Sequence, residues 1–398
     1  MNPDLSKLHP YPFEKLAQLK SQVTPPKHLD HIALSIGEPK HAAPHIAEEQ
    51  LNTHTHLLSS YPSTKGSDAL RESIAGWLNR RYQLTSEIDF ASQVIPVNGT
   101  REALFAFAQC VIDRSQSNAL VMMPNPFYQI YEGAALLSGA TPVFMNCVEE
   151  NNFIPDLDSI SVQQWQDCQL IYICNPGNPT GAVMPVEYLQ KLIKLAHKYD
   201  FIIASDECYS EIYSDENIAP PGLLAAADAM GIDDYQRCVV FHSLSKRSNL
   251  PGLRSGFVAG DASIIKQFLL YRTYHGCAMP PMTQSASISA WNDEQHVIEN
   301  RNQYRLKFDS VIELLSGKMP LFRPDAGFYL WARTPIADTD FAQQLYAQQN
   351  ITVLPGQYLS RTVDGLNPGT NYVRMALVAP VDECRDAAIR IGEFCSTL

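Results

Sequence analysis

The middle of the chain alternates short apolar runs with amphipathic stretches, and this alternation constrains the fold more than any other feature. Apolar runs rich in Val, Ile and Phe lie at 94–97, 119–123, 142–145, 170–173, 201–205, 238–242 and 256–259. Between two of these runs, residues 186–199 carry apolar side chains at helical spacing. Strand–helix alternation of this length predicts a mostly parallel, doubly wound α/β sheet. Such sheets bind ligands at the carboxyl ends of their strands.

The two ends of the chain follow a different pattern. The tail alternates candidate strands with candidate helices, at 327–331, 342–349, 372–378 and 384–394. This pattern predicts a smaller α+β domain. The first 30 residues contain five prolines and are expected to form an extended arm. The expected division is an arm joined to part of the small domain, a large ligand-binding domain and a small C-terminal domain, at 1–45, 46–290 and 291–398.

Composition excludes several classes of protein. The 398 residues are 45% apolar and 18% charged, which is a normal globular balance. A net charge of −12 argues against binding to a nucleic-acid backbone. No apolar run is long enough to cross a membrane, and no secretory signal is present. The nine cysteines form no C-x-x-C pair, so neither a disulfide framework nor a zinc site is expected. We therefore expect a reduced, cytoplasmic protein.

The segment with the most specific chemistry is 243–256, which follows a candidate strand. A lysine amine such as Lys246 can form a covalent bond with an aldehyde. The hydroxyls of Ser243 and Ser245 and the guanidinium of Arg254 suit a phosphate dianion, because Arg binds phosphate through two hydrogen bonds. A solvated Ser/Lys loop is the alternative for the Ser-x-Ser-Lys part alone.

Two more strand ends carry polar groups that suit a cofactor. Asp206 ends the run 201–205 and can pair with a protonated ring nitrogen, although such an Asp is often only a helix cap. Tyr209 can donate to a phenolic oxygen of the same ring. Asn178 lies in the rigid turn Asn-Pro-Gly-Asn-Pro-Thr-Gly, which can aim its amide at a ligand.

Two further turns are weaker signals. Gly99, Thr100 and Arg101 connect a candidate strand to a candidate helix, where free N–H groups and the helix dipole favour a phosphate. Tyr128, or Phe127 before it, follows a Pro-rich turn and is placed to stack on a pyridine ring, or else packs in the core.

An arginine in an apolar strand is the last candidate. Arg374 is flanked by Val and Met, and this setting fits capture of a substrate carboxylate or a structural ion pair. Gly37 lies in Ser-Ile-Gly-Glu-Pro near the start of the chain.

Taken in order, these segments resemble the class I (fold type I) pyridoxal-phosphate aminotransferases over nearly the whole chain. The resemblance implies that Lys246 holds the cofactor and moves a proton, and that Asp206 pairs with the pyridine nitrogen. It implies that Asn178 and Tyr209 bond the ring oxygen and that Tyr128 stacks on the ring. The residues implied to hold the cofactor phosphate, or to shape the turn around it, are Gly99, Thr100, Arg101, Ser243, Ser245 and Arg254.

The resemblance also covers the substrate and the neighbouring subunit. Arg374 is implied to bind the substrate α-carboxylate, with Gly37 and Asn178 beside it. Tyr61 matches a family tyrosine that reaches the cofactor phosphate of the next subunit, so a homodimer with composite sites is expected. Arg101 stands where Lys or Gln is more frequent, and Ser255 where an apolar residue is usual.

The identity of the substrate is the most open question. The pattern is most similar to bacterial N-succinyl-diaminopimelate aminotransferases of lysine biosynthesis, with 2-oxoglutarate as acceptor. Such a donor has three carboxylates and needs further cations, for which Lys40, Lys65 and Arg272 are candidates. Aminotransferases for aspartate, alanine or aromatic amino acids share the same motifs. A C–S lyase and an aminotransferase-like regulator are rival classes. The histidines between His28 and His56 lack a ligand pattern, so no metal is expected.

Overall fold

A seven-stranded sheet forms the centre of the larger part of the protein. The computed structural model describes all 398 residues. The sheet order is β2-β8-β7-β6-β5-β3-β4, and β8 alone runs antiparallel to its neighbours. The strands are β2 (Val94–Val97), β3 (Leu120–Asn125), β4 (Thr141–Asn146), β5 (Cys168–Cys174), β6 (Ile202–Asp206), β7 (Cys238–Ser243) and β8 (Gly256–Gly260). This confirms the α/β class and all seven expected strands within two residues.

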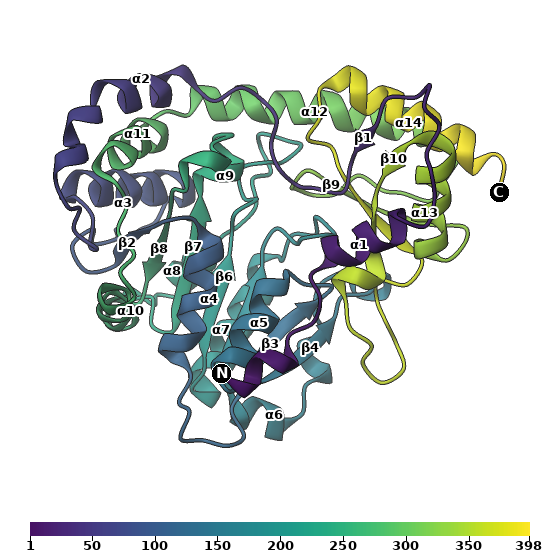
Figure 1. Cartoon of the computed structure of the whole chain (residues 1–398). Coiled ribbons are helices and arrows are strands. Elements are labelled where there is room, and N and C mark those ends of the chain that lie inside the picture. The colour runs from purple at the N-terminus through teal and green to yellow at the C-terminus, as the bar shows by residue number, and fades with distance from the viewer.

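Helices cover both faces of this sheet (Figure 1). They are α3 (Asp68–Tyr82), α4 (Thr100–Val111), α5 (Gln129–Leu137), α6 (Val162–Asp167), α7 (Val186–Tyr199), α8 (Leu223–Asp228), α10 (Ala262–His275) and α11 (Pro281–Asn292). One apolar cluster joins α4, α5 and α10 to one sheet face through residues such as Phe107, Tyr131 and Phe268. A second cluster, with Trp77 and Leu189, joins α3, α7, α8 and α11 to the other face. These two cores hold the strand ends in fixed positions.

A smaller α+β part combines the start and the end of the chain. Its three-stranded antiparallel sheet has the order β11-β12-β9, and β1 pairs with β10 in parallel. Its elements are β1 (Ile32–Ala33), α12 (Gln295–Leu315), β9 (Tyr329–Arg333), α13 (Asp338–Gln349), β10 (Ile351–Thr352), β11 (Leu354–Pro355), β12 (Tyr372–Ala376) and α14 (Val381–Cys395). The long helix α12 runs along the top of the molecule from the large part to this one (Figure 1).

The first residues are not extended throughout, which corrects the expectation from their prolines. A 3-10 turn (Pro3–Lys7) is followed by helix α1 (Pro12–Lys20). Proline suits the first position of a helix, because its missing N–H needs no partner there and its φ is already helical. The apolar face of α1 is buried through Pro12 and Leu16, and α1 contacts α13 and the turn Gly356–Leu359. Figure 1 shows α1 lying between the two parts of the molecule.

We propose that the chain divides into its arm, its large domain and its small domain between residues 45 and 46 and between residues 290 and 291. The first boundary lies at the start of α2 (His45–Thr53). The second lies at the end of α11, two residues before the helix finishes and five before α12 begins. Limited proteolysis is a direct way to examine these junctions.

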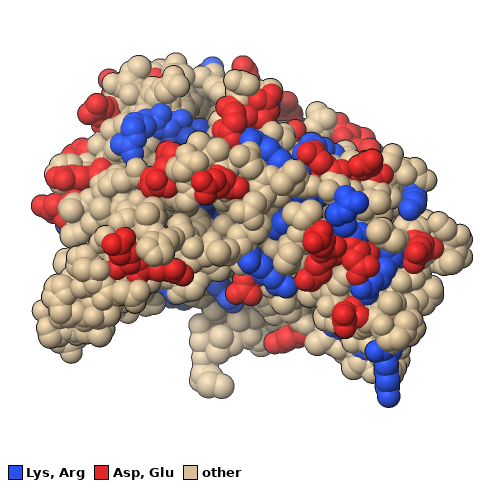
Figure 2. Space-filling model, turned by 90° about the horizontal axis from the view of Figure 1, so that it is seen from above, with Lys and Arg blue, Asp and Glu red and all other residues tan.

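The surface carries both charges in mixture. In the view of Figure 2, Lys and Arg side chains are interspersed with Asp and Glu, without a large area of positive charge. This agrees with the net charge of −12. None of the helices has both the length and the apolar character that a membrane crossing requires.

Candidate active site

A cavity of about 430 Å³ lies at the carboxyl ends of β6 and β7, between the two parts of the protein. Twelve of the fourteen residues expected in the site line it. They are Gly37, Thr100, Arg101, Tyr128, Asn178, Asp206, Tyr209, Ser243, Ser245, Lys246, Arg254 and Arg374. Gly99 lies directly behind the wall, against Arg254. Parallel strands bring these side chains together, because their carboxyl ends meet at one edge of the sheet.

Lys246 lies on the short helix α9 (Leu244–Arg247), which follows β7 directly. Its amine donates a hydrogen bond to the carbonyl of Gly37 and lies 5.2 Å from the centre of the Phe328 ring. Burial lowers the pKa of Lys246 to about 8, and the positive charge of Arg374 adds to this effect, while Cys208 opposes it. The amine therefore loses its proton, and becomes nucleophilic, at a lower pH than an ordinary lysine.

Asp206 is the last residue of β6 and is only 5% exposed. Its carboxylate accepts hydrogen bonds from the Tyr131 hydroxyl at 2.7 Å and from the Cys208 N–H at 3.3 Å. Burial raises the pKa of Asp206, while the hydrogen bonds from Cys208 and Tyr131 and the nearby His242 oppose that rise. A buried carboxylate with no cationic partner suits a positively charged ligand group.

The Gly99 turn and Arg254 form a cradle for an anion. Gly99 has φ 89° and directly precedes helix α4, whose first N–H groups are free. A Cβ at Gly99 would lie 2.1 Å from Nη2 of Arg254, so only glycine allows this approach. Arg254 donates only to the carbonyls of Pro251 and Asn98, at 3.0 and 3.4 Å. Its positive charge therefore has no acidic partner within the chain.

Serine hydroxyls complete the same side of the cavity. The Ser243 hydroxyl donates to the Ser255 carbonyl at 3.1 Å and lies 2.9 Å from the Ser245 hydroxyl. Ser255 accepts this hydrogen bond through its backbone carbonyl. A serine in place of the apolar residue that is usual in the family therefore leaves the contact intact. On the neighbouring turn, the Thr100 hydroxyl lies 3.1 Å from the sulfur of Cys208.

Arg374 faces the cavity from β12 in the smaller part of the protein. Its guanidinium donates to Oδ1 of Asn178 at 3.0 Å and to the Ser35 carbonyl at 2.8 Å, and its Nε has no partner. It also lies 4.4 Å from the centre of the Tyr329 ring. A Cβ at Gly37 would meet the Tyr329 hydroxyl at 2.0 Å, so glycine is required there. A buried guanidinium with spare donors fits a carboxylate.

Several lining residues were not found by sequence reasoning. Tyr329 shares a hydrogen bond of 3.1 Å with the Tyr209 hydroxyl, and Tyr11 of the N-terminal arm reaches the same cavity. The ring of Tyr11 lies 5.7 Å from the Arg101 guanidinium. Tyr131 contacts Asp206 from outside the cavity. No local motif marks these tyrosines, because their roles depend on contacts with distant segments.

The charges of the cavity are strongly unequal. Its lining contains four basic side chains, Arg101, Lys246, Arg254 and Arg374, and a single carboxylate, that of Asp206. The three residues named as candidates for the distal carboxylates do not join them. Lys40 and Lys65 are outside the lining, and Arg272 is buried in an ion pair with Glu102 at 2.8 Å. The cavity is therefore suited to an anionic ligand, with Arg101 as the additional cation.

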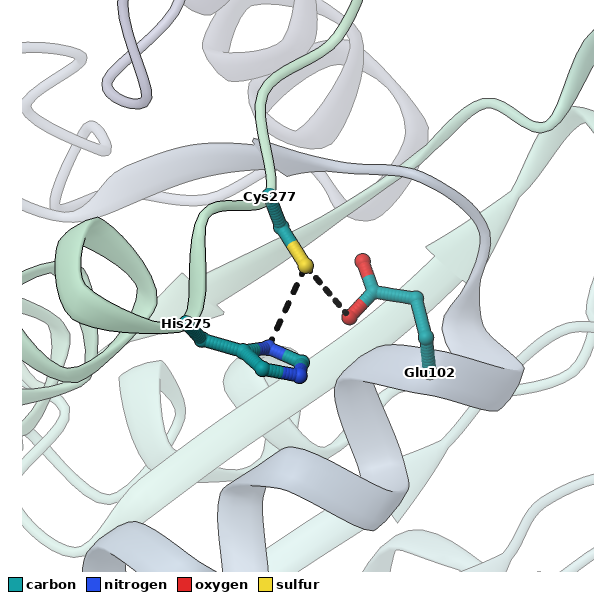
Figure 3. Close-up of side chains that lie close together, drawn as sticks. All are labelled: Glu102, His275 and Cys277. Carbon is teal, nitrogen blue, oxygen red and sulfur yellow. Dashed lines mark hydrogen bonds between the residues drawn. The ribbon is translucent and has the colours of Figure 1, made fainter.

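Glu102 also belongs to the one cluster whose side chains could hold a metal ion. Figure 3 shows the Cys277 sulfur between His275 and Glu102, at 3.2 and 3.9 Å. However, Glu102 already accepts the buried Arg272 guanidinium on one oxygen and the Asn98 N–H on the other. A fixed cation beside the carboxylate disfavours a second one, so we interpret the cluster as a hydrogen-bonded support for the Gly99 turn.

Tyr61 is the expected site residue that this chain does not bring to the cavity. Its side chain is fully exposed, in the loop between the 3-10 turn Thr55–Ser59 and α3. An exposed tyrosine outside its own cavity is free to contact a second subunit.

Comparison with known proteins agrees with this geometry. The aminotransferase class I and II family model matches residues 30–391. An LL-diaminopimelate aminotransferase from Nitratidesulfovibrio vulgaris (Hildenborough) is 31% identical, with 98% of both chains covered. Another from Syntrophobacter fumaroxidans is 33% identical, with 98% of this chain and 97% of that one covered.

Solved structures are similar over the whole chain. An aminotransferase from Neisseria meningitidis has 47% identity and a TM-score of 0.95, covering 99% of this chain and 100% of that one. Aminotransferase AspB from Helicobacter pylori has 36% identity and a TM-score of 0.91, covering 98% and 100%. A structure described as a probable N-succinyldiaminopimelate aminotransferase from Thermus thermophilus, at 24% identity and a TM-score of 0.85 over 96% and 99%, shares the fold.

The protein belongs to the class I and II aminotransferase family. This family depends on pyridoxal 5′-phosphate. The residues of the cavity fit that cofactor, because an unpaired Arg254 faces a glycine turn at a helix start, and a buried Asp206 lacks a cation. Lys246 supplies an amine with a lowered pKa between them.

Proposed function

We propose that this aminotransferase takes its amino group from a donor of the diaminopimelate type and passes it to 2-oxoglutarate. The first candidate donor is N-succinyl-LL-2,6-diaminopimelate. The proposal rests mainly on the charge of the cavity, which offers Arg374 and Arg101 to carboxylates and holds no carboxylate besides Asp206. The names of the relatives at 31–33% identity support the diaminopimelate skeleton.

The same charge distribution favours a donor whose distal amine is acylated. Free LL-diaminopimelate carries a second ammonium group, and desolvating it without a partner is costly. The only carboxylate of the lining is assigned to the cofactor ring, so it is not free to pair with that ammonium. A succinyl group converts the amine into an uncharged amide and adds a carboxylate, which suits a cavity with spare cations. LL-diaminopimelate is the second candidate, favoured by the relatives' names.

Each side chain has a role in this proposal. When bound, pyridoxal phosphate supplies an aldehyde that combines with amines and a protonated ring that withdraws electrons. Asp206 would keep the ring nitrogen protonated, and Asn178 and Tyr209 would hydrogen-bond the ring oxygen. Tyr128 would pack on the ring face. Gly99, Thr100, Ser243, Ser245 and Arg254 would hold the phosphate.

Lys246 has two tasks. Its amine would hold the cofactor in the resting protein, and, once released, would act as the base and acid that moves the proton of the donor α-carbon. A pKa near 8 suits both the removal and the return of a proton. A group whose pKa is close to the working pH can both accept and donate a proton efficiently. Arg374 orients the donor by its α-carboxylate, so that the α-proton faces this amine.

A donor panel tests the substrate. Purified protein with 2-oxoglutarate is offered N-succinyl-LL-2,6-diaminopimelate, LL-diaminopimelate, aspartate, alanine and aromatic amino acids, and glutamate is measured. We expect the succinylated donor to have the highest kcat/KM. Preference for LL-diaminopimelate would replace the first candidate with the second. Pyruvate released from cysteine conjugates without any glutamate would place the protein among the C–S lyases.

Replacing Arg101 tests how the distal end is bound. We expect Arg101→Leu to lower kcat/KM for the succinylated donor about 10-fold, which corresponds to one charged hydrogen bond. Alanine, which has no distal carboxylate, is expected to react as before. Arg101→Lys is the matched control, because it keeps the charge and should retain most of the activity. An equal loss with all donors, with weaker cofactor binding, would instead assign Arg101 to the cofactor.

We also propose that the protein is a homodimer whose sites share Tyr61 across the interface. In support, Leu58 and Tyr61 are 71% and 104% exposed and lie close together in the sequence, so both are free to contact a second subunit.

Subunit mixing tests the shared site. Tyr61→Ala and Lys246→Ala are each expected to be weak or inactive at limiting cofactor. A hybrid dimer has one site with both residues intact, so co-refolding equal amounts should restore about a quarter of the wild-type activity. If Tyr61 served its own subunit, or if the protein were a monomer, mixing would restore nothing.

A further inference from the structure

We propose that Tyr131 is a positioning residue for the cofactor, because its hydroxyl holds the Asp206 carboxylate in the orientation that faces the ring nitrogen. This inference rests on the proposed function, since it assumes that Asp206 pairs with that nitrogen. Tyr131 does not line the cavity, so it acts on the site through its neighbours, above all through its hydrogen bond to Asp206.

The contact is short and fully buried. Tyr131 lies in the first turn of α5, has no exposed surface, and donates to Oδ2 of Asp206 at 2.7 Å. The other oxygen, Oδ1, accepts the Cys208 N–H at 3.3 Å. The two donors therefore hold the carboxylate from both sides. Burial raises the pKa of Tyr131 well above its usual value, so the hydroxyl stays protonated and can only donate to a carboxylate.

The tyrosine itself is held in place by its neighbours. Its ring stacks on Tyr172 at 4.8 Å between centroids and 10° between planes, and meets Tyr128 edge-on at 5.8 Å. Tyr128 is the residue proposed to pack on the cofactor ring. Tyr131 thus contacts both the residue proposed for the ring face and the residue proposed for the ring nitrogen.

The hydroxyl also affects the charge of Asp206. Burial raises the pKa of that carboxyl, and the hydrogen bonds from Cys208 and Tyr131 lower it. The other titratable groups around it are His242 on β7, the Tyr128 hydroxyl and the thiols of Cys174 and Cys208. Without the Tyr131 hydroxyl, Oδ2 loses its donor within the chain, so the charged carboxylate is less stable and its orientation less defined.

Tyr172 provides a matched control from the same stack. It is equally buried, and its hydroxyl donates at 2.7 Å to the carbonyl of Leu104, away from Asp206. Tyr131→Phe and Tyr172→Phe therefore remove the same atom from the same aromatic pair. Only the first removes a hydrogen bond to Asp206.

The test measures cofactor affinity rather than turnover. Apoprotein is titrated with pyridoxal phosphate and with an analogue in which carbon replaces the ring nitrogen. We expect Tyr131→Phe to weaken pyridoxal phosphate binding about 10-fold, the effect of one charge-assisted hydrogen bond, and to leave binding of the analogue unchanged. Tyr172→Phe is expected to leave both affinities unchanged. The pH dependence of the bound cofactor's absorption should shift in Tyr131→Phe only.

Other outcomes distinguish a failure of the proposed role of Tyr131 from a failure of the proposed role of Asp206. Equal weakening of cofactor and analogue by Tyr131→Phe would mean a purely structural role, and no weakening of either would mean no role; each overturns this inference. Asp206→Asn is measured in parallel. If it failed to change the preference for pyridoxal phosphate over the analogue, the assignment of Asp206 in the proposed function would be wrong, whatever Tyr131 does.

Discussion

Lys246→Ala is expected to reduce multiple-turnover transamination by at least about 10³-fold. The change removes both the amine that holds the cofactor and the base that moves the proton, and general acid–base catalysis alone contributes up to about 10⁴-fold. The apoprotein should keep its fold, because the Lys246 side chain makes one hydrogen bond, to the Gly37 carbonyl. The measurement is kcat with the preferred donor, with circular dichroism as a check of folding.

Lys246→Arg is the matched control for charge. It keeps a cation at the position but has no amine that can lose its proton near neutral pH, so it should be as inactive as the alanine variant. In the wild type, hydride reduction followed by mass spectrometry should find the cofactor on the peptide that contains Lys246. Since the pKa of Lys246 is about 8, cofactor attachment should become faster as the pH rises through that value. Attachment to another lysine, or activity in either variant, would contradict the assignment.

Arg374→Lys is expected to lower kcat/KM about 10²-fold for every amino donor. The guanidinium is buried, is held by Asn178 and Ser35, and keeps spare donors for a carboxylate. Lysine keeps the charge but loses the planar fork that binds a carboxylate through two bonds. The loss of one such hydrogen bond in a buried site costs several kcal/mol at most, and the expected decrease of about 10²-fold in kcat/KM lies within that limit.

The pattern across donors distinguishes Arg374 from Arg101. Because all amino donors share the α-carboxylate, Arg374→Lys should affect alanine and the succinylated donor alike, whereas Arg101→Leu should affect only the second. Cofactor affinity in Arg374→Lys should equal that of the wild type. A loss confined to donors with a distal carboxylate would mean that Arg374 binds the far end of the substrate instead.

Much of the fold was predictable because its signals are local. The strands of the large sheet are runs of buried apolar residues, and α7 shows helical spacing over the whole of 186–199. The N-terminal arm was wrongly expected to be extended because of its five prolines, whereas Pro12 is the first residue of helix α1. The burial of Leu16 that stabilises α1 comes from segments far away in the sequence, which no local pattern shows.

The residues of the site likewise include some that local sequence signals identify and others whose role depends on packing. Asp206 is the last residue of a strand, and Lys246 and Asn178 follow strand ends, so their association follows from the topology of the sheet. Arg272 was a candidate for the substrate, yet it is paired with Glu102 behind the Gly99 turn. Arg101 is the cation that reaches the cavity instead. Which arginine is free depends on the acidic partner that packing supplies, and that partner is 170 residues away from Arg272.

The sequence by itself determined the α/β fold, the strand ends that carry chemistry and the family motifs, because these depend on periodicity and on short segments. Only the tertiary structure decided which of two stacked tyrosines touches Asp206, which cations stay unpaired and how Gly37 and Arg374 meet from opposite ends of the chain. Those outcomes depend on contacts between residues far apart in the sequence, and such contacts exist only once the chain has packed.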